Sequence, residues 1–155
     1  MFSRMLTRIL VPYDGSKNSE KSLSRAIELA HNLDSQVFLF SVINTDYISP
    51  PGMLGLIRTK SEKDIAKNWE KKVKKDTEKM LDTAAKKCKE KGITVSYHMC
   101  KGNIANEILN FANKKKITLI VIGSQGLHGI DKFKTLGSVS RRISEHAKCP
   151  VLLIR

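Results

Sequence analysis

The chain has 155 residues, the usual length of one domain, and 41% of them are hydrophobic, which excludes a disordered chain. No apolar run approaches the roughly 20 residues of a membrane-spanning helix, and the start MFSRMLTRILVPYDG lacks the small-residue cleavage site of a signal peptide. The net charge of +13, from 28 basic and 15 acidic side chains, would attract polyanions. We expect one cytoplasmic domain over residues 1–155, with no membrane segment.

The positive charge does not by itself predict a nucleic-acid-binding protein. Many of the lysines lie among glutamates in EKKVKKDTEKMLDTAAKKCKEK, a pattern typical of a solvated helix face. Aromatic residues make up 6% of the chain and are not interleaved with the lysines, as stacking on single strands would require. Nucleic acid is therefore a distant candidate partner.

The cysteines and histidines predict neither a disulfide framework nor a structural metal site. Cys88, Cys100 and Cys149 form no C-x-x-C pair, and the four histidines have no metal-ligand spacing. We interpret the cysteines as small buried or half-buried hydrophobes, with a reactive thiol or a metal ligand as the alternative.

The first part of the chain predicts two strands with a helix between them. The first strand, at 9–11, ends in the turn PYDGS, and apolar residues over 23–33 have helical spacing. QVFLFSVI at 36–43 predicts the second strand. Residues 46–62 form an irregular stretch with Pro50-Pro51-Gly52, either a flap or a partner-contact loop.

The second part continues the alternation of strands and helices. A long helix carries an apolar stripe from Ile65 to Cys88 and stops at Lys91-Gly92. The remaining predicted elements are a half-buried strand at 93–99, a helix at 104–112, a strand buried on both faces at 117–122, a helix at 138–147 and a strand at 151–154. This order predicts a single doubly wound α/β domain, Rossmann-like, with a five-stranded, mainly parallel sheet and helices on both faces.

Ligands of such sheets bind beyond the carboxyl ends of the strands, where two loops carry useful groups. Residues 123–138, GSQGLHGIDKFKTLGS, hold four glycines that let a ligand approach the main chain. Free N–H groups in such a turn, and at the start of the next helix, bind anions. Tight strand-to-helix turns also need glycine, so phosphate binding and a purely structural turn both fit. Neither a P-loop nor a G-x-G-x-x-G motif is present.

Asp14 is the informative residue of the other loop. A carboxylate just after the first strand can accept hydrogen bonds from sugar hydroxyls or help to hold a divalent cation. It can equally cap the following helix through its side chain.

Beyond these patterns, the chain resembles the nucleotide-binding branch of the universal stress protein family over nearly its whole length. The resemblance depends on ILVPYDGS, VFLFSVI, the helix-opening Gly102 and VIGSQGLHGI…LGSVSRRI…KCPVLLIR. The family's ATP-binding signature is Gly, two residues, Gly, nine residues, then Gly-Ser or Gly-Thr. Here ten residues separate Gly126 from Gly137, so a different nucleotide or weaker binding is a real alternative.

The resemblance implies a set of nucleotide-binding residues. Pro12 and Asp14 would line the adenosine pocket, and the main chain at Val42 would meet the adenine edge. The glycine loop and the helix that follows would surround the phosphates. The full implied set is Pro12, Tyr13, Asp14, Val42, Gly102, Gly123, Ser124, Gln125, Gly126, Gly129, Gly137, Ser138, Val139 and Ser140.

It also implies ATP as ligand, with Mg²⁺ or Mn²⁺ on the phosphates, and a homodimer paired through Val151–Ile154. We find no convincing catalytic set, so the expected function is an ATP-binding regulatory or stress-response protein, not an enzyme, read by a protein partner that the sequence does not identify. The alternatives are an interaction module of the same fold without nucleotide, and a slow ATPase.

Overall fold

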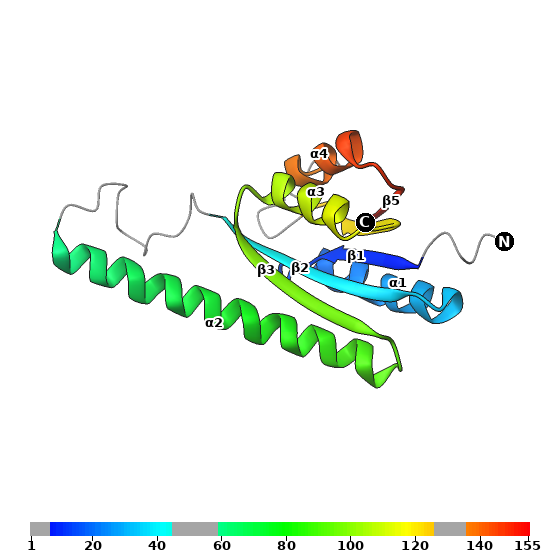
Figure 1. Cartoon of the computed structure of the whole chain (residues 1–155), viewed down its shortest axis with the longest axis horizontal. Coiled ribbons are helices and arrows are strands. Elements are labelled where there is room, and N and C mark those ends of the chain that lie inside the picture. The colour runs from blue at the N-terminus through cyan, green and yellow to red at the C-terminus, as the bar shows by residue number, and fades with distance from the viewer. Residues whose placement is uncertain (1–6, 45–58, 126–135) are drawn as a thin grey trace.

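The computed structural model describes residues 7–44, 59–125 and 136–155 (Figure 1). Strands and helices alternate along it, as the sequence predicts. In chain order they are β1 Arg8–Pro12, α1 Lys17–Leu33, β2 Gln36–Asn44, α2 Lys60–Glu90, β3 Val95–Gly102, α3 Ile104–Lys114, β4 Leu119–Gly123, α4 Ser138–His146 and β5 Val151–Ile154.

The five strands form one parallel sheet in the order β3-β2-β1-β4-β5. The chain builds outward from β1 to β3 in one direction and from β4 to β5 in the other. The two halves of the sheet therefore part between β1 and β4, which is where ligands of doubly wound folds bind. The predicted fold class is confirmed.

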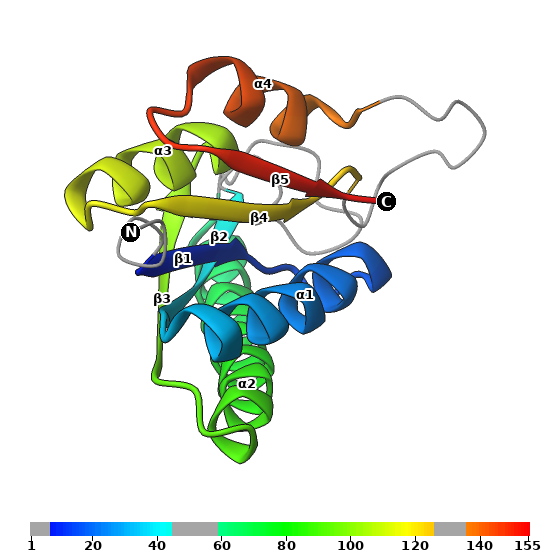
Figure 2. The ribbon, with the colours of Figure 1, turned by 90° about the vertical axis from the view of Figure 1, so that its right-hand side faces the viewer.

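Helices cover both faces of the sheet, with α1 and α2 on one side and α3 and α4 on the other (Figure 2). Alternate residues of β1 serve the two layers: Ile9 and Val11 pack with α1 and α2, and Leu10 packs with α3 and α4. The four residues Leu119–Ile122 of β4 are all buried. The prediction of a strand buried on both faces is confirmed, because helices lie over each side.

The helix α2 begins earlier than the sequence predicts. Thr59 caps it, accepting a hydrogen bond of 3.1 Å from the Glu62 N–H, and the Glu62 carboxylate accepts one of 2.8 Å from the Thr59 N–H. This capping box makes residues 60–62 helical, where we expected the end of an irregular stretch. Residues 46–58 of that stretch lie outside the described part of the chain. The predicted stop is confirmed, since Gly92 has φ +72°.

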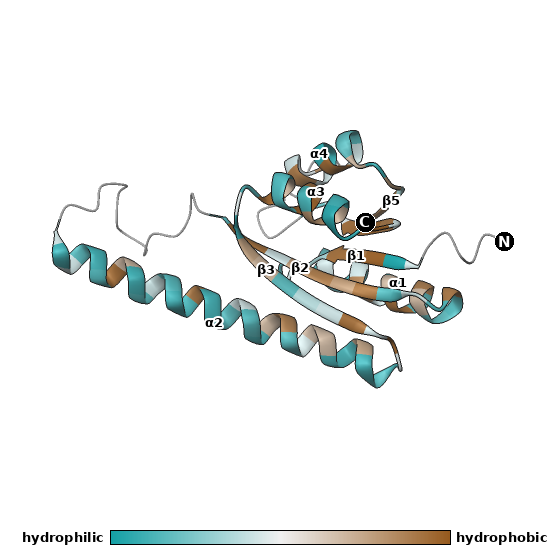
Figure 3. Cartoon of the chain, in the orientation of Figure 1, coloured by the Kyte–Doolittle hydropathy of each residue, from teal (hydrophilic) through white to brown (hydrophobic). Residues whose placement is uncertain are grey.

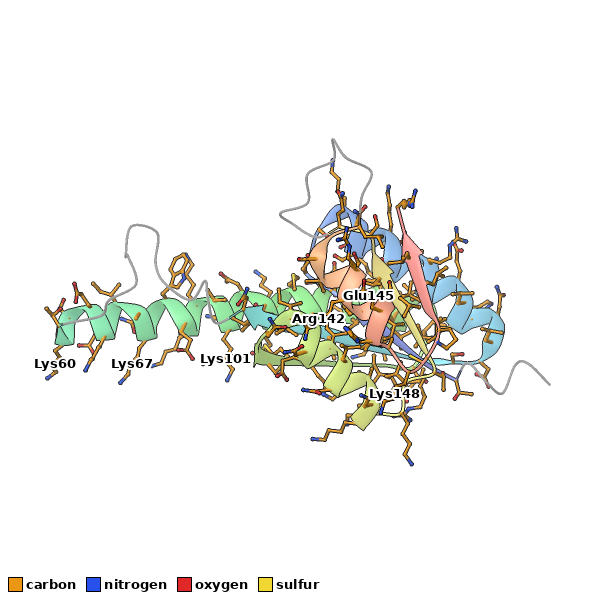
Figure 4. All side chains as sticks on the ribbon, turned by 90° about the horizontal axis from the view of Figure 1, so that it is seen from above. Lys60, Lys67, Lys101, Arg142, Glu145 and Lys148 are labelled. Carbon is orange, nitrogen blue, oxygen red and sulfur yellow. The ribbon has the colours of Figure 1, made fainter. Side chains whose placement is uncertain are left out.

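Only the C-terminal part of the predicted α2 stripe is buried. Leu81, Ala84, Ala85 and Cys88 pack in the core, whereas Ile65 is 48% exposed. The first half of α2 extends past the sheet, and its surface is largely hydrophilic (Figures 1 and 3). Lys60 and Lys67 point into solvent there (Figure 4).

Among the described helices, none is long and apolar enough to cross a membrane. The three cysteines are free thiols, and Cys88 is buried in the core. Burial raises the pKa of Cys88 to about 11, so its thiol stays protonated and packs as a small hydrophobe.

Candidate functional site

The turn between β1 and α1 is ordered by its own polar groups. Asp14 Oδ1 accepts a hydrogen bond of 2.9 Å from the Ser16 N–H, and Gly15 has φ +78°. Ser16 is the N-cap of α1 and accepts a bond of 3.1 Å from the Ser19 N–H. Ser16, and not Asp14, therefore caps α1. The Asp14 side chain instead shapes the turn that precedes the helix.

The end of β4 lies directly against the start of α1. A Cβ on Gly123 would lie 2.7 Å from Asn18 Cβ, closer than such atoms approach, and 3.2 Å from the Asn18 backbone carbon, which is a tight contact. Asn18 Nδ2 also donates a hydrogen bond of 3.1 Å to Gln125 O. Glycine is therefore needed at position 123 for close approach, and the glycine loop is in contact with the start of α1.

The glycine loop, residues 123–138, returns to the place where it starts. The Gly137 N–H donates to Ser124 O over 2.8 Å, and Ser140 Oγ donates to the same oxygen over 2.7 Å. The Ser124 N–H in turn donates to Ile154 O over 2.8 Å. Ser140 is 2% exposed, so its hydroxyl holds the two ends of the loop together. Ser138 is exposed and Val139 is half-buried in the first turn of α4.

Two helices thus begin beside the carboxyl end of β4, α1 on one side and α4 on the other (Figure 2). The N-terminus of a helix has unpaired N–H groups and the positive end of the helix dipole. The helix α1 contacts the backbone of Gly123–Gln125 through Asn18, and α4 contacts it through Gly137 and Ser140, at the point where the order of strands reverses. This arrangement suits an anion, above all a phosphate.

Pro12 and Tyr13 border this point from the end of β1. Both are buried, and the Tyr13 N–H donates to Phe40 O over 2.9 Å, which extends the pairing with β2. The Tyr13 hydroxyl donates to the Glu20 carboxylate, and Lys87 Nζ of α2 donates to Glu20 Oε2 over 2.8 Å.

This network sets the ionisation of its members. Burial, followed by the Glu20 carboxylate, raises the pKa of Tyr13 above its usual range, so the phenol stays neutral. Burial acts to raise the pKa of Glu20, but Lys87 and the Tyr13 hydroxyl outweigh it and hold that pKa low. The β1–α1 turn is thereby tied to α2 by a charged group.

Two of the predicted site residues lie farther from this point. Gly102 ends the edge strand β3, three strands from β4, or about 14 Å at the usual spacing of strands. Its φ is +147°, and an added Cβ would lie 2.9 Å from Glu107 Cγ, so local geometry explains the glycine. Val42 is half-buried in β2, in register with Cys100. Gly126 and Gly129 lie outside the described residues.

Asn18 is the residue of this site that sequence reasoning missed. It follows the cap Ser16 by two positions and reads as an ordinary polar residue of a first helical turn. Only the pairing of β1 with β4 brings it beneath Gly123, so no local signal in the sequence identifies it. The described residues contain no group of three or more His, Cys, Asp or Glu that could hold a metal ion.

The chain matches the family model of the universal stress protein family over residues 5–155. It is 34% identical over 151 residues to the universal stress protein YxiE of Bacillus subtilis, covering 97% of this chain and 100% of YxiE. The fold and the site thus define a doubly wound α/β protein in which two helices begin at the switch point of its sheet. The chain belongs to the universal stress protein family.

Solved structures show the same fold. The protein MJ0577 superposes with a TM-score of 0.81 at 23% identity, over 97% of this chain and 96% of that one. A universal stress protein in complex with cAMP gives 0.68 at 18% identity, over 97% of both chains. The universal stress protein of Archaeoglobus fulgidus in complex with dAMP gives 0.61 at 21%, over 97% of this chain and 99% of that one.

Proposed function

We propose that this protein binds an adenine nucleotide, ATP in the first instance, at the carboxyl edge between β1 and β4, and that it acts as a nucleotide-dependent regulatory protein. The observation that carries the proposal is the pair of helix N-termini, α1 and α4, that flank the backbone of Gly123–Gln125. The cAMP and dAMP complexes of proteins with this fold support adenosine phosphates as the ligand class.

The residues divide into two groups around this ligand. Pro12, Asp14 and the main chain at Val42 would face the adenosine part. Gly123, Gly137 and the first turn of α4 would face the phosphates, with Ser138 as an exposed hydroxyl donor. Ser140 keeps a positioning role, because its hydroxyl already donates to Ser124 O. Gly102 is not carried into the proposal, since its glycine is explained by its φ and by Glu107.

A divalent cation would enter this site with the phosphates. We propose that Asp14, two residues after β1, would share it and that the exposed hydroxyl of Ser138 would contribute a further oxygen. Mg²⁺ typically keeps several waters and binds through substrate phosphates and one or two carboxylates, so no dedicated metal cage is required. We propose binding in place of turnover, and phosphate release in the steady state would identify a slow ATPase.

The test is to denature the purified protein, identify any released nucleotide by mass, and measure the melting temperature with millimolar ATP and Mg²⁺. A ligand at a hundredfold excess over its Kd stabilises the native state by about 2.7 kcal/mol. Comparing the thermal shifts given by AMP, cAMP, dAMP and ATP shows which phosphate groups contribute to binding. If no nucleotide is released and none of these nucleotides raises the melting temperature, the function is that of an interaction module without nucleotide.

Gly137→Val locates the ligand within the protein. A Cβ at Gly137 would meet Ser124 O at 3.4 Å, an ordinary contact, and its φ of −63° suits any residue. The apo fold should therefore survive while the thermal shift with ATP is lost. Gly92→Ala, at the opposite end of the sheet, is a control for lost stability alone: its φ of +72° makes alanine costly there, but the thermal shift with ATP should remain. A full shift in Gly137→Val places the ligand elsewhere.

We also propose that β5 forms the homodimer. This strand pairs with β4 on one side and is an edge strand of the described sheet on the other. Leu152 in it is 36% exposed. Pro150 O and Ile154 O accept from β4, so by alternation the Leu153 N–H points to the outer edge. Leu153→Pro should give a monomer in sedimentation equilibrium and Leu153→Ala a dimer. A dimer in both variants would remove β5 from the interface.

A further inference from the structure

Asn18 lies where the start of α1 contacts the glycine loop. It is the second residue of α1, and its side-chain amide donates a 3.1 Å hydrogen bond to Gln125 O, 107 residues further along the chain. The first turn of α1 also packs directly against Gly123, where a Cβ would lie 2.7 Å from Asn18 Cβ. Asn18 is thus the side chain of α1 that holds the segment leaving β4.

The preceding peptide is held from the other side of the site. Ser124 O accepts hydrogen bonds from the Gly137 N–H and from Ser140 Oγ, both at the start of α4. Consecutive carbonyls, at Ser124 and Gln125, are therefore fixed by donors from two different helices. Because each peptide unit is planar and trans, a fixed carbonyl also fixes the direction of the N–H in the same unit.

We propose that Asn18 is a positioning residue for the phosphate-binding backbone. Asn18 holds the Gln125 carbonyl while α4 holds the Ser124 carbonyl, so the backbone of Gln125 is fixed on both sides, and the Gln125 N–H keeps the direction on which an anion-binding turn depends. This inference rests on the proposed function. Asn18 acts through Gln125 and not by touching the nucleotide, so its loss weakens ligands that carry phosphates and spares the nucleoside.

The test compares ATP with adenosine by isothermal titration calorimetry in Asn18→Ala and in the control Asn32→Ala. Asn32 is an exposed asparagine near the other end of the same helix. Asn18→Ala should raise the Kd for ATP about three- to tenfold, the usual effect of one lost hydrogen bond, and leave the Kd for adenosine within about twofold. Asn18→Gln, which keeps the amide, should recover part of the loss. An unchanged Kd for ATP, or equal losses for ATP and adenosine, overturns the proposal.

A second measurement needs no nucleotide. Amide hydrogen exchange is followed by NMR at Ser124 and Gly137, whose N–H groups donate to Ile154 O and Ser124 O. Exchange at both should be faster in Asn18→Ala and unchanged in Asn32→Ala. If the wild-type protein binds neither ATP nor adenosine, the proposed function fails, and this exchange alone then decides whether Asn18 holds the segment. Unchanged exchange in that case overturns the inference.

Discussion

Gly123 and Gly102 each end a strand at the carboxyl edge of the sheet, yet the two positions need glycine for different reasons. Gly123, in the middle of the sheet, lies so close to Asn18 that no Cβ fits. Gly102, on the edge strand, has space limited by the flexible Glu107 side chain and a φ of +147° that other residues rarely adopt. A glycine after a strand therefore indicates a ligand site only when its position in the sheet is also known.

The surroundings of the two glycines differ in the same way. The start of α1 and the start of α4 converge on the end of β4, whereas the described chain after β3 enters α3 through the ordinary Asn103 cap. Two helix N-termini therefore lie at the end of the central strand β4, and one lies at the end of the edge strand β3. The experiments that follow test this contrast, beginning with the largest expected effect.

Gly123→Ala should be the most damaging of the changes. Its Cβ would meet the Cβ and backbone of Asn18, and a helix backbone cannot move aside as a side-chain end can. We expect a loss of about 1–3 kcal/mol in the free energy of unfolding, measured by urea denaturation, together with loss of ATP binding. Wild-type stability would show that β4 and α1 are less closely packed than described.

Gly102→Ala should cost about 1–2 kcal/mol through its backbone conformation and leave the affinity for ATP unchanged. The double change Gly102→Ala with Glu107→Ala separates the two causes. If φ dominates, removing the Glu107 side chain restores little stability in the same denaturation experiment. A large fall in ATP affinity would return Gly102 to the nucleotide site.

Glu20→Gln should lower stability by about 0.5–1 kcal/mol, because Lys87 and Glu20 are partly exposed and solvent screens their attraction. Gln keeps an acceptor for the Tyr13 hydroxyl but removes the charge that faces Lys87. The folded pKa of Glu20 is lowered, so its contribution is present above the ordinary value of 4.5 and is lost as the pH falls through the folded pKa. Between pH 7 and 3, the free energy of unfolding should fall less steeply in Glu20→Gln than in Glu28→Gln. Glu28 is the control because it forms an exposed ion pair with Arg25.

His98 on the edge strand should give the smallest effect, visible as a dependence on pH. Burial, and then Lys115, lower its pKa from 6.5, and its ring lies 5.1 Å from that of Phe111. The unfolded chain therefore binds a proton more readily, and stability falls as the pH drops below about 6.5 toward the folded pKa. His98→Phe should flatten the profile between pH 7 and 5 in thermal melts. An equal slope in both proteins would assign that loss of stability to other groups.

Much of the fold could be predicted because its signals are local. Hydrophobic periodicity defines β1, β2, β4 and β5 to within two residues at either end, and Gly92 stops α2 where a left-handed residue is expected. The start of α2 was missed because the capping box Thr59–Glu62 is a pair of polar residues inside a stretch marked by prolines. The apolar stripe on α2 predicted that the whole helix packs on the core, but its first half is not buried. Hydrophobic periodicity does not show how far the sheet extends beneath a helix.

The sequence by itself determined the α/β alternation, the glycine loop and the position of Asp14 after the first strand, because each depends on residues that are neighbours in the chain. Only the tertiary structure decided that Asn18 lies beneath Gly123, that Ser140 closes the loop onto Ser124, and that Gly102 stands three strands away. These relations come from the order of strands in the sheet. Strand order is set by the packing of both faces at once, and no local spacing of residues encodes it.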